Sequence, residues 1–265
     1  MSGTGKPYDG GMLVAVDIGN TNIVLGFLED GRIAGTYRIT TKADHTSDEY
    51  GLMITDFLRL SGFSPNDVDD VIVASVVPQV MHSFRASIVK FLGIDPMVVG
   101  PGIKTGMNIR IDDPKSLGAD CLADCAGAYY TYGGPALVAD FGTATTFNYV
   151  NAKGAITCGL ITPGIRTAAA ALWTGTAQLP EVEITRPDSI LATGTKPAMQ
   201  AGLYYNFLGG IERIIEQFHE EIHEEFTVIA TGGLGRVFMD DTDLIDIYDP
   251  DLIFKGMAEI RARNR

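Results

Sequence analysis

The sequence predicts an α/β protein made of two duplicated domains, each with a mixed sheet and flanking helices. The first observation is a repeat: the apolar runs Leu13–Val16 and Leu137–Ala139 each lead to an aspartate, Asp17 or Asp140, that opens a D-x-G turn. A β-prone run, a glycine turn and a further apolar stretch follow in both copies, which is the pattern of a three-stranded meander. After each meander, apolar runs alternate with amphipathic stretches, which indicates parallel strands joined by helices. The length of 265 residues suits two domains of ordinary size.

The first half begins with the meander and continues with helices and strands in alternation. Thr46 and Glu49 form a predicted capping box, and acidic residues crowd the first turn of a helix that runs to about Leu60. The next expected elements are a buried strand at Val71–Val77, a helix at about Gln79–Leu92 and a strand at Met97–Val99.

The second half repeats this plan after a loop-rich connection and a helix of small residues that ends near Tyr132. Its meander spans Ala136–Ile161. The remaining expected elements are helices at Ala168–Trp173, about Pro197–Glu225 and about Pro250–Ala262, and a strand at Val228–Ala230. We place the domain boundary after residue 117, so that the domains are 12–117 and 118–265, preceded by a flexible leader, 1–11.

Composition favours a cytoplasmic, globular protein. Hydrophobic residues make up 46% of the chain and charged residues 20%, and no apolar run approaches the roughly 18 residues needed to cross a bilayer. No secretory signal precedes Met12, which resembles a natural start. Three cysteines, an odd number, argue against a disulfide framework. The net charge of −13 disfavours non-specific binding to nucleic acid, and we expect neither a nucleic-acid nor a membrane partner.

The two D-x-G turns have the composition of phosphate-binding loops. Glycine lets backbone approach a ligand closely, hydroxyls donate hydrogen bonds, and the aspartate can hold a cation. Taken alone, such a turn is more often an ordinary hairpin than a phosphate site. Neither loop contains Lys or Arg, and no G-x-x-x-x-G-K-[ST] motif is present, so a bound nucleotide would need a divalent metal ion. Cys121 and Cys125 are spaced for one helix face, but we interpret them as small buried residues rather than zinc ligands.

An ordered set of motifs covers the chain from about Leu13 to its end. The set comprises DIGNTN (Asp17–Asn22), TSDEYG (Thr46–Gly51), SVVP (Ser75–Pro78), VGPGIKTG (Val99–Gly106), LGAD (Leu117–Asp120), DFGTATT (Asp140–Thr146), TPGI (Thr162–Ile165), TAQLP (Thr176–Pro180) and TGG (Thr231–Gly233). With these motifs the chain resembles type III pantothenate kinases, within the acetate-kinase, sugar-kinase, Hsp70 and actin superfamily. The resemblance implies two actin-like (ribonuclease H-like) domains with five-stranded mixed sheets and a nucleotide in the cleft between them. It further implies ATP-dependent phosphorylation of pantothenate to phosphopantothenate, the first step of coenzyme A biosynthesis, by a homodimer whose acceptor pocket is completed at the interface.

The resemblance also implies a role for each matching residue. Asp120 would be the catalytic proton acceptor, although a carboxylate at a helix N-terminus can equally serve the helix dipole. Asp17 would help to place Mg²⁺ or another divalent cation, and Asp140 would bind a monovalent cation, K⁺ or NH₄⁺. The residues implied to bind ATP are Asp17, Ile18, Gly19, Asn20, Thr21, Asn22, Ile23, Val24, Thr143, Thr231, Gly232 and Gly233. Those implied to bind pantothenate are Ile111, Gly118, Ala119, Asp120, Cys121 and Thr195.

The chain departs from the family pattern in the predicted acceptor pocket. Cys121 stands where the family motif G-A-D-R has an arginine that is assigned to pantothenate, and cysteine brings no positive charge. Ile111 replaces a frequent tyrosine, and Cys158 replaces a glycine. Three alternatives follow: weakened pantothenate binding with Lys104, Lys115 or Arg166 supplying the charge, a kinase for a related small alcohol, or a nucleotide-binding paralogue that acts as a regulator.

Overall fold

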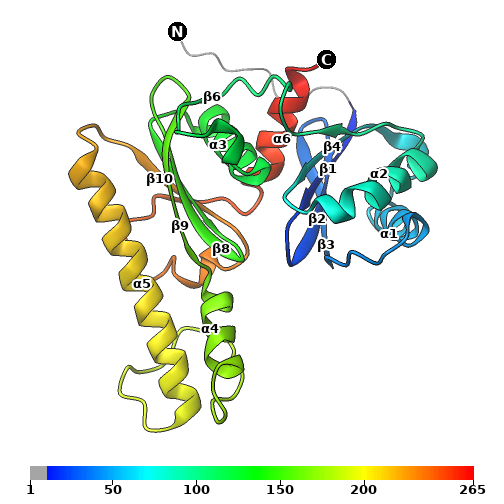
Figure 1. Ribbon diagram of the computed structural model, residues 1–265. Coiled ribbons are helices and arrows are strands. Elements are labelled where there is room, and N and C mark those ends of the chain that lie inside the picture. The colour runs from blue at the N-terminus through cyan, green and yellow to red at the C-terminus, as the bar shows by residue number, and fades with distance from the viewer. Residues whose placement is uncertain (1–10) are drawn as a thin grey trace. The chain divides into compact units, whose positions relative to one another are not determined.

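The computed structural model describes residues 11–265, so residues 1–10 of the predicted flexible leader, 1–11, lie outside the described residues (Figure 1). Contacts divide the chain into two compact units. The first unit contains the described residues up to Gly133 together with Asp251–Arg265, and the second contains Gly134–Pro250. The domain boundary that we place after residue 117 stays a prediction.

The first unit contains a five-stranded mixed sheet in the order β3-β2-β1-β4-β5. The strands are β1 (Met12–Ile18), β2 (Asn22–Glu29), β3 (Arg32–Thr40), β4 (Val68–Ser75) and β5 (Met97–Val98). The first three are antiparallel neighbours, whereas β4 runs parallel to β1 and β5 runs parallel to β4. The remaining elements are α1 (Ser47–Leu60), η1 (Pro65–Asp67), α2 (Pro78–Leu92), β6 (Asn108–Ile109), η2 (Pro114–Ser116), α3 (Ala119–Tyr132) and α6 (Leu252–Ala262).

The second unit repeats this sheet, with its own strands in the order β9-β8-β7-β10-β11. They are β7 (Ala136–Phe141), β8 (Ala144–Val150), β9 (Ala155–Pro163), β10 (Thr227–Thr231) and β11 (Ile247–Tyr248). Strand directions match those of the first sheet pair by pair. Helices α4 (Ile165–Thr174) and α5 (Thr195–Glu221) and the short η3 (Gly235–Val237) complete the unit. The predicted duplicated α/β fold with mixed sheets is therefore confirmed, whereas the expectation of five strands in each sheet holds only for the first, because the sheet that contains β7 to β11 has six strands in all.

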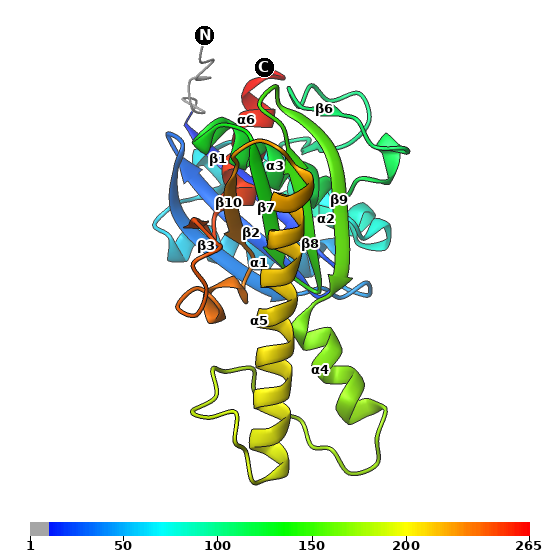
Figure 2. The ribbon, with the colours of Figure 1, turned by 90° about the vertical axis from the view of Figure 1, so that its left-hand side faces the viewer.

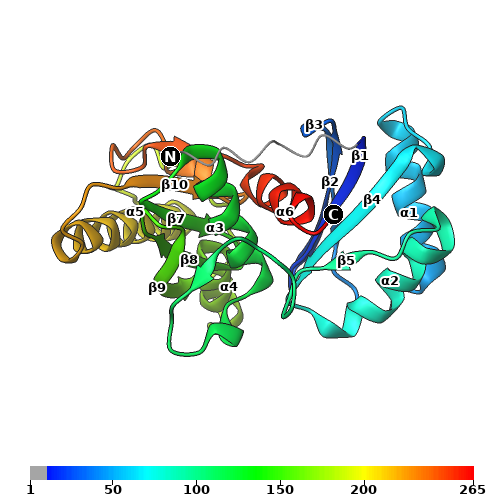
Figure 3. The ribbon, with the colours of Figure 1, turned by 90° about the horizontal axis from the view of Figure 1, so that it is seen from above.

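Helices cover both faces of the first sheet (Figure 3). Helices α1 and α2 lie on one face, and α6 lies on the other. Strand β1 is buried along almost its whole length, because both of its faces are covered. The core includes Tyr50 of α1 and Phe84 of α2, whose rings pack edge to face. Complete burial of each such side chain contributes about 1.5–3 kcal/mol.

Helices α3 and α6 pack closely against each other at glycine residues. A Cβ atom added at Gly256 of α6 would overlap the carbonyl oxygen of Ala123, and one at Gly127 of α3 would overlap that of Leu252. The two backbones therefore approach more closely than any larger side chain allows. This packing attaches the C-terminal helix to the first unit.

The predicted helix ends differ from the structure in the second unit. Helix α5 ends at Glu221, before the expected end at Glu225, because Ile222 adopts extended backbone with φ −95° and ψ 111°. Helix α4 begins at Ile165 rather than at Ala168, directly after Gly164. In Figure 2, α5 runs along the sheet of its unit and its N-terminal half projects beyond the sheet together with α4. Within residues 11–265 no helix combines the length and apolarity that a bilayer span requires.

Candidate active site

The first predicted phosphate loop is the turn between β1 and β2. The N–H of Gly19 donates to the carbonyl of Asn22 at 3.0 Å, which closes the turn. Thr41, directly after β3, holds it from the side: its hydroxyl donates to the carbonyl of Gly19 at 2.6 Å and its N–H to that of Thr21 at 3.0 Å. Asn20 and Thr21 are exposed at the tip. The loop is thus fixed through its carbonyl groups while its tip faces solvent.

Asp17 lies at the base of this loop, half-buried and opposite Val24 in the β1–β2 register. Ile18 and Ile23 form the next pair and are buried, so they support the loop from the core. A carboxylate beside an exposed, hydroxyl-bearing turn provides the hard oxygen ligands that Mg²⁺ prefers, with phosphate and water oxygens completing the coordination.

Asp120 occupies the first turn of α3, after Gly118 at the N-cap. Its Oδ1 accepts a hydrogen bond from the N–H of Cys121 at 2.8 Å. A Cβ atom at Gly118 would overlap Oδ1 of Asp120 and would lie 3.7 Å from Cγ1 of Val76. Val76 in turn donates its N–H to the carbonyl of Ile18 at 3.1 Å. These contacts place Asp120 at the carboxyl ends of β1 and β4, the edge from which the first loop emerges.

The second loop lies between β7 and β8 in the other unit. The N–H of Gly142 donates to the carbonyl of Ala144 at 3.1 Å. The carbonyl of Thr143 accepts from the N–H of Gly164 at 3.0 Å and from the hydroxyl of Thr167 at 2.6 Å. Gly164 has no room for a side chain, because an added Cβ would lie 2.9 Å from the carbonyl carbon of Thr143. The start of α4 is therefore packed directly against this loop.

The T-G-G turn after β10 closes against the same loop. Thr231 pairs with Asp140 in the parallel register, and Gly232 follows with φ +85°. A Cβ at Gly232 would overlap Oδ1 of Asp140 and would lie 2.7 Å from the N atom of Phe141. Both the backbone conformation and the lack of space require glycine here. The fold alone therefore accounts for Gly232, whether or not a nucleoside binds beside it. Gly233 is exposed beyond it.

The predicted acceptor residues are divided between the units. Ile111 is half-buried between β6 and η2, and Gly118, Ala119 and Cys121 surround Asp120 at the start of α3. Thr195 is the exposed first residue of α5, at the end of the helix that projects beyond the sheet in Figures 1 and 2. Within its own unit, Thr195 is therefore separate from the loop that carries Asp140 and Thr143.

The cysteines differ in environment. Cys121 is half-buried beside Asp120, Cys125 is buried, and Cys158 is exposed on β9. Burial raises the pKa of the Cys125 thiol well above its usual value, with a smaller contribution from the neighbouring Cys121. A buried neutral thiol packs as a small apolar group.

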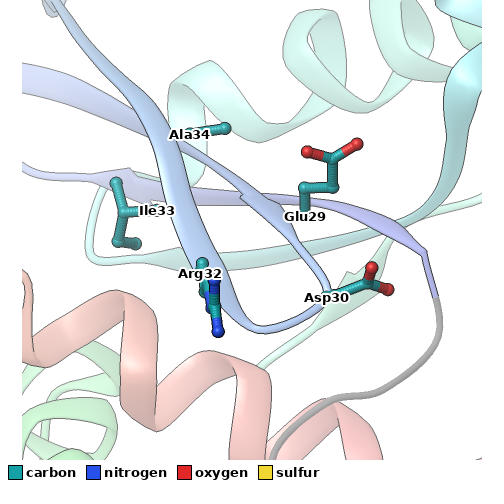
Figure 4. Close-up of a pocket in the computed structure, with 5 residues that line it drawn as sticks. All are labelled: Glu29, Asp30, Arg32, Ile33 and Ala34. Carbon is teal, nitrogen blue, oxygen red and sulfur yellow. The ribbon is translucent and has the colours of Figure 1, made fainter.

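A surface hollow of about 500 Å³ lies at the turn between β2 and β3. It is lined by Glu29, Asp30, Arg32, Ile33 and Ala34, which Figure 4 shows around the turn. None of the predicted site residues lines it, and it lies at the opposite end of β2 from the first phosphate loop.

Residues 13–217 match the family model of type III pantothenate kinase, which covers more than half of the chain. The chain belongs to the type III pantothenate kinase family. A protein of that name from Bifidobacterium adolescentis is 79% identical over 96% of this chain and 99% of its own length. Proteins of the same name from Agathobacter rectalis and Bacillus cytotoxicus are 45% and 43% identical, each over 96% of this chain and over 98% and 97% of their own lengths.

Solved structures agree at the level of the fold. A conserved putative Baf family transcriptional activator from Campylobacter jejuni aligns with a TM-score of 0.58 at 22% identity, over 95% of this chain and 98% of its own. The ethanolamine utilization protein EutJ from Carboxydothermus hydrogenoformans aligns with a TM-score of 0.56 at 14% identity, over 96% and 91%. Both likenesses concern the fold alone.

For a type III pantothenate kinase, the structure adds residues that sequence reasoning missed. Thr41 and Thr167 hold the two loops by their carbonyls, and Val76 lies beside Gly118, the N-cap of α3, while its N–H bonds to the carbonyl of Ile18 in β1. One signal in the sequence indicates the threonines: each lies shortly after the third strand of its meander. Val76 lies within the S-V-V-P motif, but only the packing shows which neighbours it contacts.

Proposed function

We propose that this type III pantothenate kinase catalyses the ATP-dependent phosphorylation of pantothenate to phosphopantothenate, the first step of coenzyme A biosynthesis. The observation that carries the proposal is the position of Asp120 near the first phosphate loop. Gly118, two residues before Asp120, lies beside Val76, and the N–H of Val76 donates to the carbonyl of Ile18, where the loop begins. A base beside a phosphate loop is the arrangement that phosphoryl transfer to an alcohol needs.

In the proposed reaction, the primary hydroxyl of pantothenate attacks the γ-phosphorus of ATP in line. The new O–P bond forms as the bond between the γ-phosphorus and the bridging oxygen breaks, and ADP leaves with that oxygen. Asp120 orients the hydroxyl and accepts its proton, which leaves late because the transition state is loose. Positioning and charge neutralisation supply most of the acceleration.

The loops bind the triphosphate in this proposal. Residues Asp17 to Val24 bind it from the first unit, and Thr143 with Thr231, Gly232 and Gly233 bind ATP from the second. Asp17 would help to hold Mg²⁺ and Asp140 a monovalent cation, K⁺ or NH₄⁺, since both are carboxylates beside exposed oxygen donors. Bound cations would neutralise the charge that develops on the transferred group.

We assign the carboxylate of pantothenate to Lys115. Among the cations that could replace the family arginine at Cys121, Lys115 lies in η2, shortly before the acceptor motif that begins at Leu117. Lys104 lies at the opposite end of α3 from Asp120. Its backbone N–H and carbonyl are hydrogen-bonded to the side chain of Asn264, and the nearby Gly106 packs against Tyr130, near the C-terminal end of α3. The other substrate residues would be Ile111, Gly118, Ala119 and Thr195.

Incubation of the purified protein with ATP, Mg²⁺, K⁺ and pantothenate tests the function, with phosphopantothenate measured by mass spectrometry. We expect Asp120→Asn to lower kcat by about 10²–10⁴-fold while nucleotide affinity stays unchanged. Asp112→Asn, an exposed carboxylate of the preceding loop, is the matched control and should retain activity. Nucleotide binding without turnover of pantothenate or its analogues would instead identify a regulatory paralogue, and turnover of another alcohol alone would identify a related kinase.

A further inference from the structure

The two phosphate loops pose an electrostatic problem. Neither contains Lys or Arg, and the chain carries a formal charge of −13. A triphosphate brings further negative charge to this surface, and metal ions neutralise only part of it. The rest of this charge requires basic side chains that lie outside the loops but near each turn.

Lys42 lies beside the first loop. Its neighbour Thr41 makes two hydrogen bonds to the loop carbonyls, 2.6 Å to Gly19 and 3.0 Å to Thr21. On the other side, the carbonyl of Lys42 accepts a hydrogen bond from the hydroxyl of Tyr50 at 2.7 Å, which fixes the backbone to α1. The Lys42 side chain is exposed. Its backbone is thus held rigidly next to the loop while its ammonium group remains available.

Lys42 is not committed to a carboxylate among residues 11–265. The charge of Lys42 is the smallest of the causes that lower the pKa of Glu49, after the hydrogen bonds from Thr46, which are the largest. No ion pair involves Lys42 in the described part of the chain. An uncommitted lysine on a fixed backbone is suited to a phosphate, which it binds as a point charge.

Arg166 occupies the equivalent place at the second loop. Its neighbour Thr167 donates its hydroxyl to the carbonyl of Thr143 at 2.6 Å, and Gly164 donates its N–H to the same carbonyl at 3.0 Å. Arg166 is exposed in the first turn of α4, and no carboxylate of the described residues forms an ion pair with it. The positive end of the helix dipole adds to its charge at this point.

The same device therefore occurs in both repeats. After the third strand of each meander, a threonine hydroxyl binds a loop carbonyl at 2.6 Å, and a basic residue stands next to that threonine. The distance along the chain from the third strand to the threonine differs between the repeats. Thr41 directly follows β3 and precedes an extended segment, whereas Thr167 lies within α4, which begins immediately after Gly164. Resting on the proposed function, we infer that Lys42 and Arg166 are phosphate-binding residues that supply the positive charge absent from the loops.

The experiment measures the affinity of the full-length protein for a non-hydrolysable ATP analogue with Mg²⁺, together with KM for ATP and for pantothenate. Lys42→Met and Arg166→Met should each weaken nucleotide affinity roughly 10-fold, as expected for a lost charge-assisted contact, with KM for pantothenate unchanged. The salt dependence of nucleotide binding should become shallower in both variants. Lys42→Arg, which keeps the positive charge, should retain most of the wild-type affinity.

Two control variants remove the same charge at the opposite ends of the same meanders. Arg32→Met lies at the β2–β3 turn and Lys153→Met at the β8–β9 turn, and both should keep the affinity of the wild type. Unchanged nucleotide affinity in Lys42→Met or Arg166→Met, with a wild type that phosphorylates pantothenate, overturns the inference for that residue. A rise in KM for pantothenate alone would reassign Arg166 to the carboxylate. A wild type without nucleotide binding would overturn the proposed function itself.

Discussion

Cys121 directly follows Asp120 in the first turn of α3, where the family motif has an arginine. A charged hydrogen bond to a carboxylate contributes about 1.5–3 kcal/mol, which corresponds to roughly 10- to 100-fold in affinity. We therefore expect Cys121→Arg to lower KM for pantothenate by that factor. Cys121→Ser, which keeps the size and adds no charge, is the control. If the arginine variant leaves KM unchanged, the missing cation does not limit binding.

Also at the residue scale, Tyr204 on α5 donates its hydroxyl to Asp241 and to the carbonyl of Val237. Burial, followed by the hydrogen bond to Asp241, raises the pKa of Tyr204 well above its usual value of 10.0. The folded protein therefore keeps this proton at pH values where the unfolded chain loses it. The stability that Tyr204 contributes is complete below about pH 10 and declines as the pH rises above that value.

Urea denaturation of Tyr204→Phe at several pH values tests this reasoning. The variant should lose about 1.5–3 kcal/mol of unfolding free energy at pH 8, because a hydrogen bond to a charged group is removed. The difference from the wild type should shrink above pH 10. A difference that stays constant up to pH 11 would show that the Tyr204 proton does not contribute to alkaline instability.

At the scale of elements, the crossing of α3 and α6 depends on glycine. Gly256→Ala should destabilise the protein by about 1–3 kcal/mol, because the new Cβ overlaps the Ala123 carbonyl and the helices must separate. Gly210→Ala on α5 is the matched control: nothing lies within 4 Å of the added Cβ, so the better helix propensity of alanine should stabilise by about 0.5–1 kcal/mol. Equal effects in chemical denaturation would mean that the crossing tolerates a side chain.

At the scale of the whole molecule, we propose a homodimer with the acceptor pocket completed by the partner. Thr195 lies at the projecting end of α5, and apolar side chains nearby in sequence or on β9 are exposed, with Ile161 77% and Leu191 84% accessible. The proposed dimer interface would cover these side chains. Light scattering should give twice the chain mass of 28.4 kDa.

Ile161→Asp should shift this protein towards the monomer and reduce kcat/KM for pantothenate, while KM for ATP should change little. Leu60→Asp, at a site that is 70% exposed on α1, should change neither property. A monomeric wild type with full activity would contradict the proposed dimer.

Much of the fold follows from local sequence. The Thr46–Glu49 capping box is present as predicted, with Thr46 accepting from the Glu49 N–H and Glu49 accepting from the Thr46 N–H, because its partners are near in sequence. The antiparallel pairing within each meander and the parallel pairing of the strands after it follow from the repeated pattern. The end of α5 did not follow, since the apolar pattern continues past Ile222 although the backbone becomes extended there.

The sequence by itself determined the duplicated α/β fold, the two D-x-G turns and the family, because these depend on residue order and short-range pattern. Only the tertiary structure decided which distant residues meet them. Thr41 and Thr167 reach the loop carbonyls, Val76 joins the end of β1 and lies beside Gly118 at the start of α3, and Gly232 is required by the closeness of Asp140. These contacts join segments separated by long stretches of chain, and such contacts are set by how strands and helices pack rather than by local preference.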